Sequence, residues 1–497
     1  MNLKIFKRWW IVLLLIVILG IFLRNINFKE TFIFAHDGDL SAWIVKDIVF
    51  DKHIRLIGQE TSAPGVFIGP LYYYALIPFY FLSGWEAIGG VYLALIIGAL
   101  TIVSYYYVFN KVFDRTTGLI AAFVQAVLTF NVSHDRWVVP TITTNLWVIW
   151  FFYGVMMILK GNYNFLILLG VLAGLVWHIN FSLAPLFTLV LIAAYLSKKL
   201  PDKKQIFFGI LSFFITSVPF WLFELRHGFS QVKTILGFIT VSEKQYELGF
   251  LNKLYLIFLK VSGNLTSLFF YPLRYEGFAK YTLFLGILVL GYVLVKRKVI
   301  NLRILTIFYS WIVVMFLTFS ILAKAISEYY FDNINVIFLS IFILTLSYIY
   351  KNLKFGSFAL LVIFITMTFR TYSFFSEKTD YDSKGYLERK NVVNYIKNDS
   401  ISRGYPCISV SYITNPGDNV GFRYLFFLNN LHVNEPKSES PNYTIVIPPG
   451  LSTDSVRYIS GAFGVIPPDK DYSKEHIAKS CSGQNSNLTE SMLGFTY

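Results

Sequence analysis

The chain has 497 residues, of which 55% are apolar, 19% aromatic and 14% charged, and its formal net charge is +14. Soluble domains carry about 25% charged residues, so this composition leaves too few polar side chains to cover a water-facing surface and excludes a soluble enzyme. The positive charge does not indicate a nucleic-acid partner, because it is confined to short segments between long apolar runs. We therefore expect a multi-pass protein of the cell membrane.

Apolar runs recur along the first three quarters of the chain and predict a mainly α-helical transmembrane bundle of about eleven spans. The first run follows Lys7 and Arg8, as in a signal peptide, but no small-residue cleavage site comes after it. We interpret this run as a retained anchor. The predicted spans are residues 9–23, 88–109, 118–133, 141–159, 164–178, 181–197, 206–222, 281–295, 304–323, 334–350 and 355–371.

Basic residues gather in the links between alternate spans, which predicts the orientation of the bundle. Short cytoplasmic loops collect Lys and Arg, so the N-terminus is expected inside and, with an odd number of spans, the C-terminus outside. The residues concerned are Lys4, Lys7 and Arg8, Lys111 and Arg115, Lys160, Lys198, Lys199, Lys203 and Lys204, Lys296, Arg297, Lys298 and Arg303, and Lys351 and Lys354.

Two further apolar stretches are predicted not to cross the membrane. Residues 71–83 are too short and contain Pro78, which favours a helix along the outer interface with its tyrosines at headgroup level. Residues 254–272 contain Lys260, Asn264 and Pro272, which make a lipid-facing span costly. A crossing there would also move the basic link at residues 296–303 to the outside.

The chain is expected to divide into a transmembrane domain, residues 1–371, and an extracytoplasmic soluble domain, residues 372–497. The first domain has a long first external loop at residues 24–87 and a second long external segment near 223–280. From about residue 372 the sequence becomes polar, and mixed strand and helix patterns predict a small α/β domain. Both cysteines, Cys407 and Cys481, lie there, and the sequence leaves open whether they form a disulfide or remain thiols.

The first external loop holds the most reactive combination of side chains. Asp37 and Asp39 follow an apolar Phe-Ile-Phe run, so two carboxylates emerge close to the bilayer surface. Lys52 and Arg55 come next, followed by a run of three tyrosines at residues 72–74. A candidate base, cations and aromatic faces are thus expected at the same depth relative to the bilayer surface.

This order of features resembles the GT-C glycosyltransferases, in the branch that uses polyprenyl-phosphate sugars and includes protein mannosyltransferases and aminoarabinose transferases. The matching pieces are HDGD after the first span, LIGQETS, GPLYYY, WHINFSLAP and FELRHGF, within about residues 1–350. The resemblance implies that Asp37 is the general base that deprotonates an acceptor hydroxyl as it attacks the anomeric carbon. It further implies inversion at that carbon, a polyprenyl-phosphate-linked donor, and an external lipid, polysaccharide or protein acceptor.

A departing phosphate needs cationic or hydrogen-bonding partners, and several residues are candidates for binding it or the rest of the substrate. Each also has a structural explanation: headgroup anchoring for the basic residues, an ion pair with Asp135 for Arg136, a buried structural role for His178, and the aromatic belt for the tyrosines. The candidates are Lys52, Arg55, Tyr72, Tyr73, Arg136, His178, Arg226, His227, Glu328 and Tyr329.

Asp37 and Asp39 form a D-x-D pair, which leaves open a divalent metal ion; we predict no cofactor, because two carboxylates do not fill a magnesium shell. The structural alternative for both is to cap the helix that follows. The main rival function is a transporter or flippase of lipid-linked sugars, which would place charges at mid-membrane. A glycan ligase and a membrane anchor for the tail are further alternatives.

Overall fold

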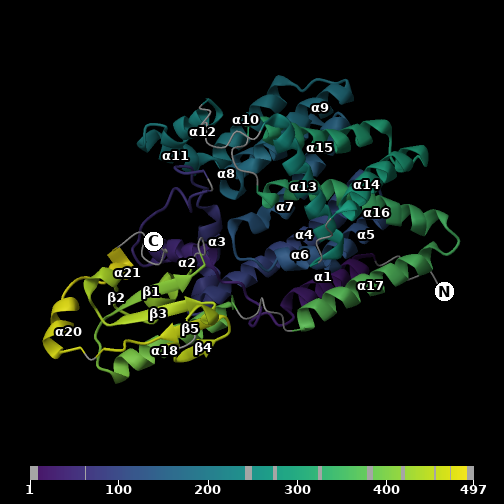
Figure 1. The fold of residues 1–497 in the computed structure, drawn as a ribbon. Coiled ribbons are helices and arrows are strands. Elements are labelled where there is room, and N and C mark those ends of the chain that lie inside the picture. The colour runs from purple at the N-terminus through teal and green to yellow at the C-terminus, as the bar shows by residue number, and fades with distance from the viewer. Residues whose placement is uncertain are drawn as a thin grey trace.

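The structure is a computed structural model, and it describes residues 9–61, 63–240, 249–272, 277–322, 327–377, 384–415, 420–452, 455–470 and 472–489. Figure 1 shows a bundle of helices with a small sheet at one end, beside helices α2 and α3. The basic residues Lys4, Lys7 and Arg8 lie outside the described residues.

Helices form nearly all of the chain up to residue 377. In chain order they are α1 (Trp9–Asn25), α2 (His36–Val49), α3 (Leu71–Leu82), α4 (Gly90–Val112), α5 (Arg115–Val127), α6 (Thr129–His134), α7 (Thr144–Leu159), α8 (Leu166–Ile179), α9 (Thr188–Ser197), α10 (Lys203–Thr216), α11 (Val218–Arg226), α12 (Ser230–Thr240), α13 (Phe250–Phe270), α14 (Phe278–Lys296), α15 (Leu302–Leu322), the short 3-10 helix η7 (Glu328–Ile334), α16 (Asn335–Asn352) and α17 (Gly356–Ser376).

Six helical stretches among the described residues are long and apolar enough to cross a membrane. Helices α10 and α11 meet at a bend of 63° and make a seventh if they form one span. The predicted spans at α1, α8 and α9 are shorter apolar helices, and the one at 118–133 is divided between α5 and α6. The polytopic helical bundle is therefore confirmed, whereas the total of eleven spans stays a prediction.

The basic links after α4, α7 and α16 lie together at one end of the bundle. The Lys160 ammonium donates to the carbonyl of Val112 at 3.2 Å, and Lys351 pairs with Asp114 at 2.6 Å. The link after α4 thus contacts both the end of α7 and the end of α16. This gathering is the arrangement that a cytoplasmic face requires, although the orientation of the termini stays a prediction.

Helix α13 occupies the apolar stretch 254–272 and lies across the start of α14. Near its beginning, the Phe258 ring stacks on Tyr281 at 5.3 Å; at its end, Phe269 and Phe270 line a cavity with Ala279. The first half of α13 therefore packs against the first turns of α14. Helix α13 is not among the six candidate spans, so whether it crosses the membrane stays a prediction; a helix replaces the expected loop.

The first external loop is folded into helices α2 and α3 and a short two-stranded bridge between Glu60 and Phe67. Helix α3 was expected at the interface with its tyrosines at headgroup level, and that expectation is wrong for Tyr72, Tyr73 and Tyr80. These three side chains are buried. The Tyr80 ring lies 6.3 Å from the Tyr424 ring of the tail, whereas Tyr73 packs against Gly58 and hydrogen-bonds to Gln59 of the first external loop.

The tail forms a five-stranded sheet in the order β2-β1-β3-β5-β4, with β1 parallel to β2 and β3, and β5 antiparallel to β3 and β4. The expected α/β unit is confirmed, and Cys407 and Cys481 form a disulfide within it. Its elements are α18 (Tyr386–Ser402), β1 (Ile408–Thr414), α19 (Arg423–Leu428), β2 (Val433–Asn434), β3 (Asn442–Ile447), β4 (Tyr458–Ser460), β5 (Phe463–Ile466), α20 (Lys474–Ser480) and α21 (Ser486–Thr489).

The sheet unit and the first external loop share one hydrophobic core. Phe34 lies 5.2 Å from the Tyr386 ring, and Trp43 lies 6.2 Å from Phe427. Gly421 has a φ of +70°, and a Cβ there would lie 2.8 Å from the backbone carbon of Ala35. The tail backbone thus touches the residue that precedes α2, so the tail fixes where α2 begins.

Candidate active site

Asp37 lies in the first turn of α2 and its side chain is exposed. The helix begins at His36, after an extended Ala35, so the two aspartates lie inside the first turn and neither side chain caps α2. Within the described residues, no hydrogen bond or ion pair engages the Asp37 carboxylate. The positive end of the helix dipole stabilises an anion at this position. Asp37 is thus an accessible carboxylate held on a rigid element.

Asp39 faces the opposite way, into the contact between α2 and the tail. Its Oδ1 accepts the Tyr424 N–H at 2.8 Å and its Oδ2 accepts the Arg423 N–H at 3.2 Å, and the side chain is 6% exposed. Burial raises the pKa of Asp39 to about 6. Both oxygens are therefore used to cap α19. These contacts favour a structural role for Asp39. It caps α19, whereas the sequence suggested that it caps its own helix, α2.

Tyr73 connects the region of Asp37 with that of Arg55. Its hydroxyl lies 3.2 Å from the Gln59 N–H and 3.3 Å from the Gln59 side-chain oxygen. Burial raises the pKa of Tyr73, the negative charge of Asp37 raises it further, and the positive charge of Arg55 opposes this rise. The phenol thus lies within electrostatic reach of both the candidate base and a candidate phosphate ligand.

Arg55 and Lys52 lie beyond the other end of α2. The Arg55 guanidinium forms an ion pair with Asp47, whose Cα is ten residues, or about 15 Å, along the helix from that of Asp37. The Nε of Arg55 is buried and, in the part of the chain that the structure describes, has no hydrogen-bond partner. Lys52 is exposed, with a left-handed backbone. Arg55 therefore has an unused donor, and Lys52 has an accessible charge.

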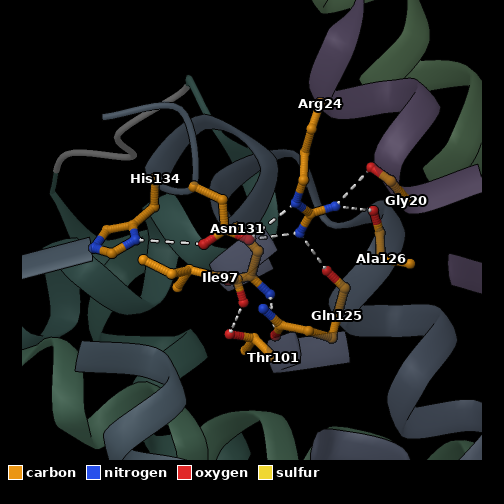
Figure 2. Close-up of polar contacts among 9 residues, drawn as sticks. Gly20, Arg24, Ile97, Thr101, Gln125, Ala126, Asn131 and His134 are labelled. Atoms are coloured by element: carbon orange, nitrogen blue, oxygen red, sulfur yellow. Dashed lines mark hydrogen bonds and ion pairs between the residues drawn. The ribbon is translucent and has the colours of Figure 1, made fainter. Parts of the chain in front are cut away.

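A buried network fixes the segment that leads from α1 to α2. The Arg24 guanidinium pairs with Asp135 at 2.7 Å. It also donates to the carbonyl oxygens of Gly20, Gln125 and Ala126 (Figure 2). Arg24 is fully buried. Such a pair is strongly destabilising to break, because one charge would remain without a partner. The network joins the end of α1 to α5 and α6.

Arg136 supports the same segment from outside the network. It donates to the carbonyl of Ile26 at 2.7 Å and to the Thr31 hydroxyl, and it lies 4.4 Å from the centre of the Phe375 ring. The suggested partner of Arg136, Asp135, instead pairs with Arg24. We infer that Arg136 orders residues 26–31, which precede Asp37.

His178 positions the start of α3. Its Nδ1 accepts the Leu71 N–H at 3.4 Å, so Nε2 carries the proton and donates to the Thr216 carbonyl at 3.2 Å. A Cβ at Gly69 would lie 2.2 Å from the imidazole. Glycine is therefore required at residue 69. These contacts favour the structural role for His178. It contacts Leu71, the residue that precedes Tyr72 and Tyr73. Tyr72 itself is buried, with no hydrogen-bond partner for its hydroxyl in the described ranges.

The four remaining candidates lie on two other parts of the outer surface. Arg226 and His227 are exposed at the end of α11, and the imidazole stacks on Phe223 at 4.0 Å. Glu328 pairs with Lys260 of α13 at 3.0 Å, and the ring of the adjacent Tyr329, 40% exposed, lies 4.6 Å from that of Tyr330. No contact between described residues joins these four side chains to Asp37 or Tyr73.

No known family model matches the chain, and neither does any curated protein sequence. Two solved structures of ArnT from Cupriavidus metallidurans do match. The one bound to undecaprenyl phosphate has a TM-score of 0.56 and 11% identity, over 96% of this chain and 99% of that one. The apo structure has a TM-score of 0.57 and 11% identity, over 92% and 97%. This chain has the ArnT fold. An oligosaccharyltransferase from Archaeoglobus fulgidus has a TM-score of 0.47 and 15% identity, over 88% and 68%.

Several polar residues near the candidate site did not stand out in the sequence. Gln59 belongs to the LIGQETS motif, but only the fold shows that it binds Tyr73. Arg24 follows the first span and reads as an interfacial charge. Its burial depends on Asp135, which is 111 residues away, so no local pattern reveals it.

Proposed function

We propose that this chain is an inverting glycosyltransferase that moves a sugar from a polyprenyl-phosphate carrier to an acceptor hydroxyl outside the membrane. The observation that carries the proposal is the exposed Asp37 carboxylate, which has no partner among the described residues and lies at the start of a helix beside the bundle. The ArnT fold supports it, because one matching ArnT structure is bound to undecaprenyl phosphate.

The first chemical role belongs to Asp37. An ionised carboxylate within about 3 Å of an acceptor hydroxyl takes its proton as the oxygen attacks the anomeric carbon. A single displacement inverts that carbon and needs no covalent sugar intermediate. Because Asp39 is occupied by the two N–H groups of α19, Asp37 is the acid of the D-x-D pair that remains available. The proposed reaction therefore uses one carboxylate.

The second role is to stabilise the phosphate that leaves. As the bond between the sugar and the phosphate breaks, negative charge grows on the phosphate oxygens, and fixed donors stabilise it. Arg55 offers a guanidinium whose side chain is 24% exposed, and Lys52 offers an exposed ammonium. The buried Tyr73 hydroxyl lies within electrostatic reach of both Arg55 and Asp37. We assign the leaving phosphate to the surface between Asp37 and Arg55. The identity of the sugar and acceptor does not enter this assignment.

The test measures release of undecaprenyl phosphate by the purified chain in detergent, with a panel of undecaprenyl-phosphate-linked sugars and an envelope extract as the source of acceptors. We expect Asp37→Asn to reduce the release at least 100-fold, the lower end of general acid–base contributions. Glu30→Gln is the matched control, since it removes an exposed carboxylate from the same external segment. A near wild-type rate in a folded Asp37→Asn protein would show that Asp37 is not the base.

Metal dependence is a separate question that the same assay answers. The described residues contain no cluster of three or more His, Cys, Asp or Glu side chains placed to hold an ion. We propose a reaction that needs no divalent metal, so adding EDTA should leave the release rate unchanged. Loss of activity with EDTA and its return with Mg²⁺ would show that the reaction needs a divalent metal.

A further inference from the structure

An apolar groove lies between α14 and α17, away from the candidate active site. Its volume is about 680 Å³, and it reaches from Thr129 and Ala279 at one end to Leu290 and Ile363 at the other. Only 22% of the apolar window of α14 and 17% of that of α17 are buried, the lowest values among the six candidate spans. Most side chains of these helices therefore face outward, so in a membrane the groove meets hydrocarbon.

Arg370 is the one charged side chain among the described residues that line the groove. Its guanidinium donates to the carbonyls of Phe269 and Tyr271 at 2.7 and 2.6 Å. Carbonyl groups fix the direction of the guanidinium but do not cancel its charge. Within the described ranges, no carboxylate lies at salt-bridge distance from Arg370. Backbone carbonyls are usual partners of a charged side chain on a membrane helix, but they leave the net positive charge of the guanidinium in place, so the site still attracts an anion.

The position of Arg370 within the apolar groove suits the binding of an amphiphilic molecule. Arg370 is one to two turns before Phe375, whose carbonyl accepts a hydrogen bond from Asn27 at the start of the external segment. The cation is therefore near the outer end of α17. The opposite end of the groove reaches Leu290, only six residues before the basic Lys296. An anionic head at Arg370 would thus leave room for a hydrocarbon chain directed toward the cytoplasmic end.

We propose that this groove binds an anionic phospholipid of the bilayer, with its phosphate on Arg370 and an acyl chain between α14 and α17. Pairing with Arg370 supplies the charge complementarity, as for headgroups held in basic pockets between membrane helices. A sugar carrier is a poorer occupant, because its phosphate must lie beside the reacting sugar and hence near Asp37. No residue of the first external loop is among the described residues that line the groove.

The test uses native mass spectrometry of the purified full chain in detergent, with equal amounts of phosphatidylglycerol and phosphatidylcholine. We expect the wild type to retain one phosphatidylglycerol, with a preference of roughly fivefold for the single charge contact. Arg370→Gln should abolish the preference, and Arg370→Lys should keep most of it. Arg303→Gln, which removes an exposed cation near the start of α15, is the matched control and should behave as wild type.

A second variant tests the groove without touching the cation. A Cβ at Gly286 meets no atom within 4 Å, so Gly286→Leu extends into the groove without a backbone clash. We expect this variant to lose retention of both lipids by at least tenfold. Gly263→Leu is the control, because a Cβ there also meets open space but residue 263 does not line the groove.

Three results would overturn the proposal. They are equal retention of the two lipids by the wild type, unchanged retention in both Arg370→Gln and Gly286→Leu, and displacement of phosphatidylglycerol by equimolar undecaprenyl phosphate. Asp37→Asn should retain phosphatidylglycerol as the wild type does. Failure of the sugar-transfer proposal and failure of the lipid proposal are thus distinguishable, since each has its own variant and readout.

Discussion

Asp39 should hold the tail against the first external loop, and removing its carboxylate should weaken that contact. Asp39→Ala leaves the N–H groups of Tyr424, which is buried, and Arg423, which is partly buried, without an acceptor. An unsatisfied buried donor costs about 1–3 kcal/mol, so the two together predict a loss of about 2–6 kcal/mol in the free energy of unfolding. The exposed Asp37 is the comparison, because Asp37→Ala should change it by less than about 0.5 kcal/mol.

The pH dependence of this contact has a defined sign. Burial raises the pKa of Asp39 from 3.8 to about 6, so the folded protein holds the proton more tightly than the unfolded chain. The contribution of this group to stability is fully present below about pH 4 and is lost as the pH rises through about 6. Linkage gives a change of about 3 kcal/mol over this window. Asp39→Asn, which cannot ionise, should lack this slope.

The assay is urea unfolding of the detergent-solubilised protein, followed by trypsin cleavage in the tail, at several pH values between 4 and 7.5. A wild-type midpoint in Asp39→Ala, or an equal loss in Asp37→Ala, would refute the assignment of these two carboxylates to different roles. A difference between the wild type and Asp39→Asn that stays constant with pH would refute the reasoning about burial.

Three other changes test separate parts of the structure. Tyr73→Phe removes the hydroxyl that meets the first loop; we expect a stability loss of about 1 kcal/mol and a lower transfer rate, and an unchanged rate would remove Tyr73 from the site. Gly69→Ala puts a Cβ against His178 and should lower the melting temperature, whereas Gly450→Ala, where a Cβ meets no atom within 4 Å and φ is not positive, is the matched control and should leave it unchanged. Reducing the disulfide between Cys407 and Cys481 should destabilise the tail by about 2–5 kcal/mol, visible as faster proteolysis confined to residues after 384.

The architecture was predictable because it follows from composition and periodicity. Long apolar runs with basic links dictate a membrane bundle, and the switch to polar residues near 372 marks the sheet unit. Contacts between distant segments were not predictable in the same way. The tyrosines of α3 look like interfacial residues in the sequence, but in the structure residues 58–59 pack against Tyr73 and the tail packs against Tyr80. Asp39 looks like a cap of its own helix, but it accepts the N–H groups of Arg423 and Tyr424.

The candidate site, too, was predictable from the sequence only in part. The sequence places a carboxylate just after the first span, and the structure places Asp37 on an exposed helical turn, where the chemistry requires accessibility. The roles of His178 and Arg136 depend on partners from other segments, Leu71 and Ile26, that only the folded chain brings near. The sequence places Arg370 in the last predicted span. Its proposed role in binding a phosphate depends on how the carbonyls of Phe269 and Tyr271, 99 or more residues away, orient the guanidinium.

The most direct measurement is a cryo-electron microscopy structure of the chain with undecaprenyl phosphate added in excess. The account predicts phosphate density between the side chains of Asp37 and Arg55, with the isoprenoid chain leaving that site toward the bilayer. Density for the phosphate at the basic turn between α14 and α15, or at Arg370 alone with the surface around Asp37 empty, would contradict it.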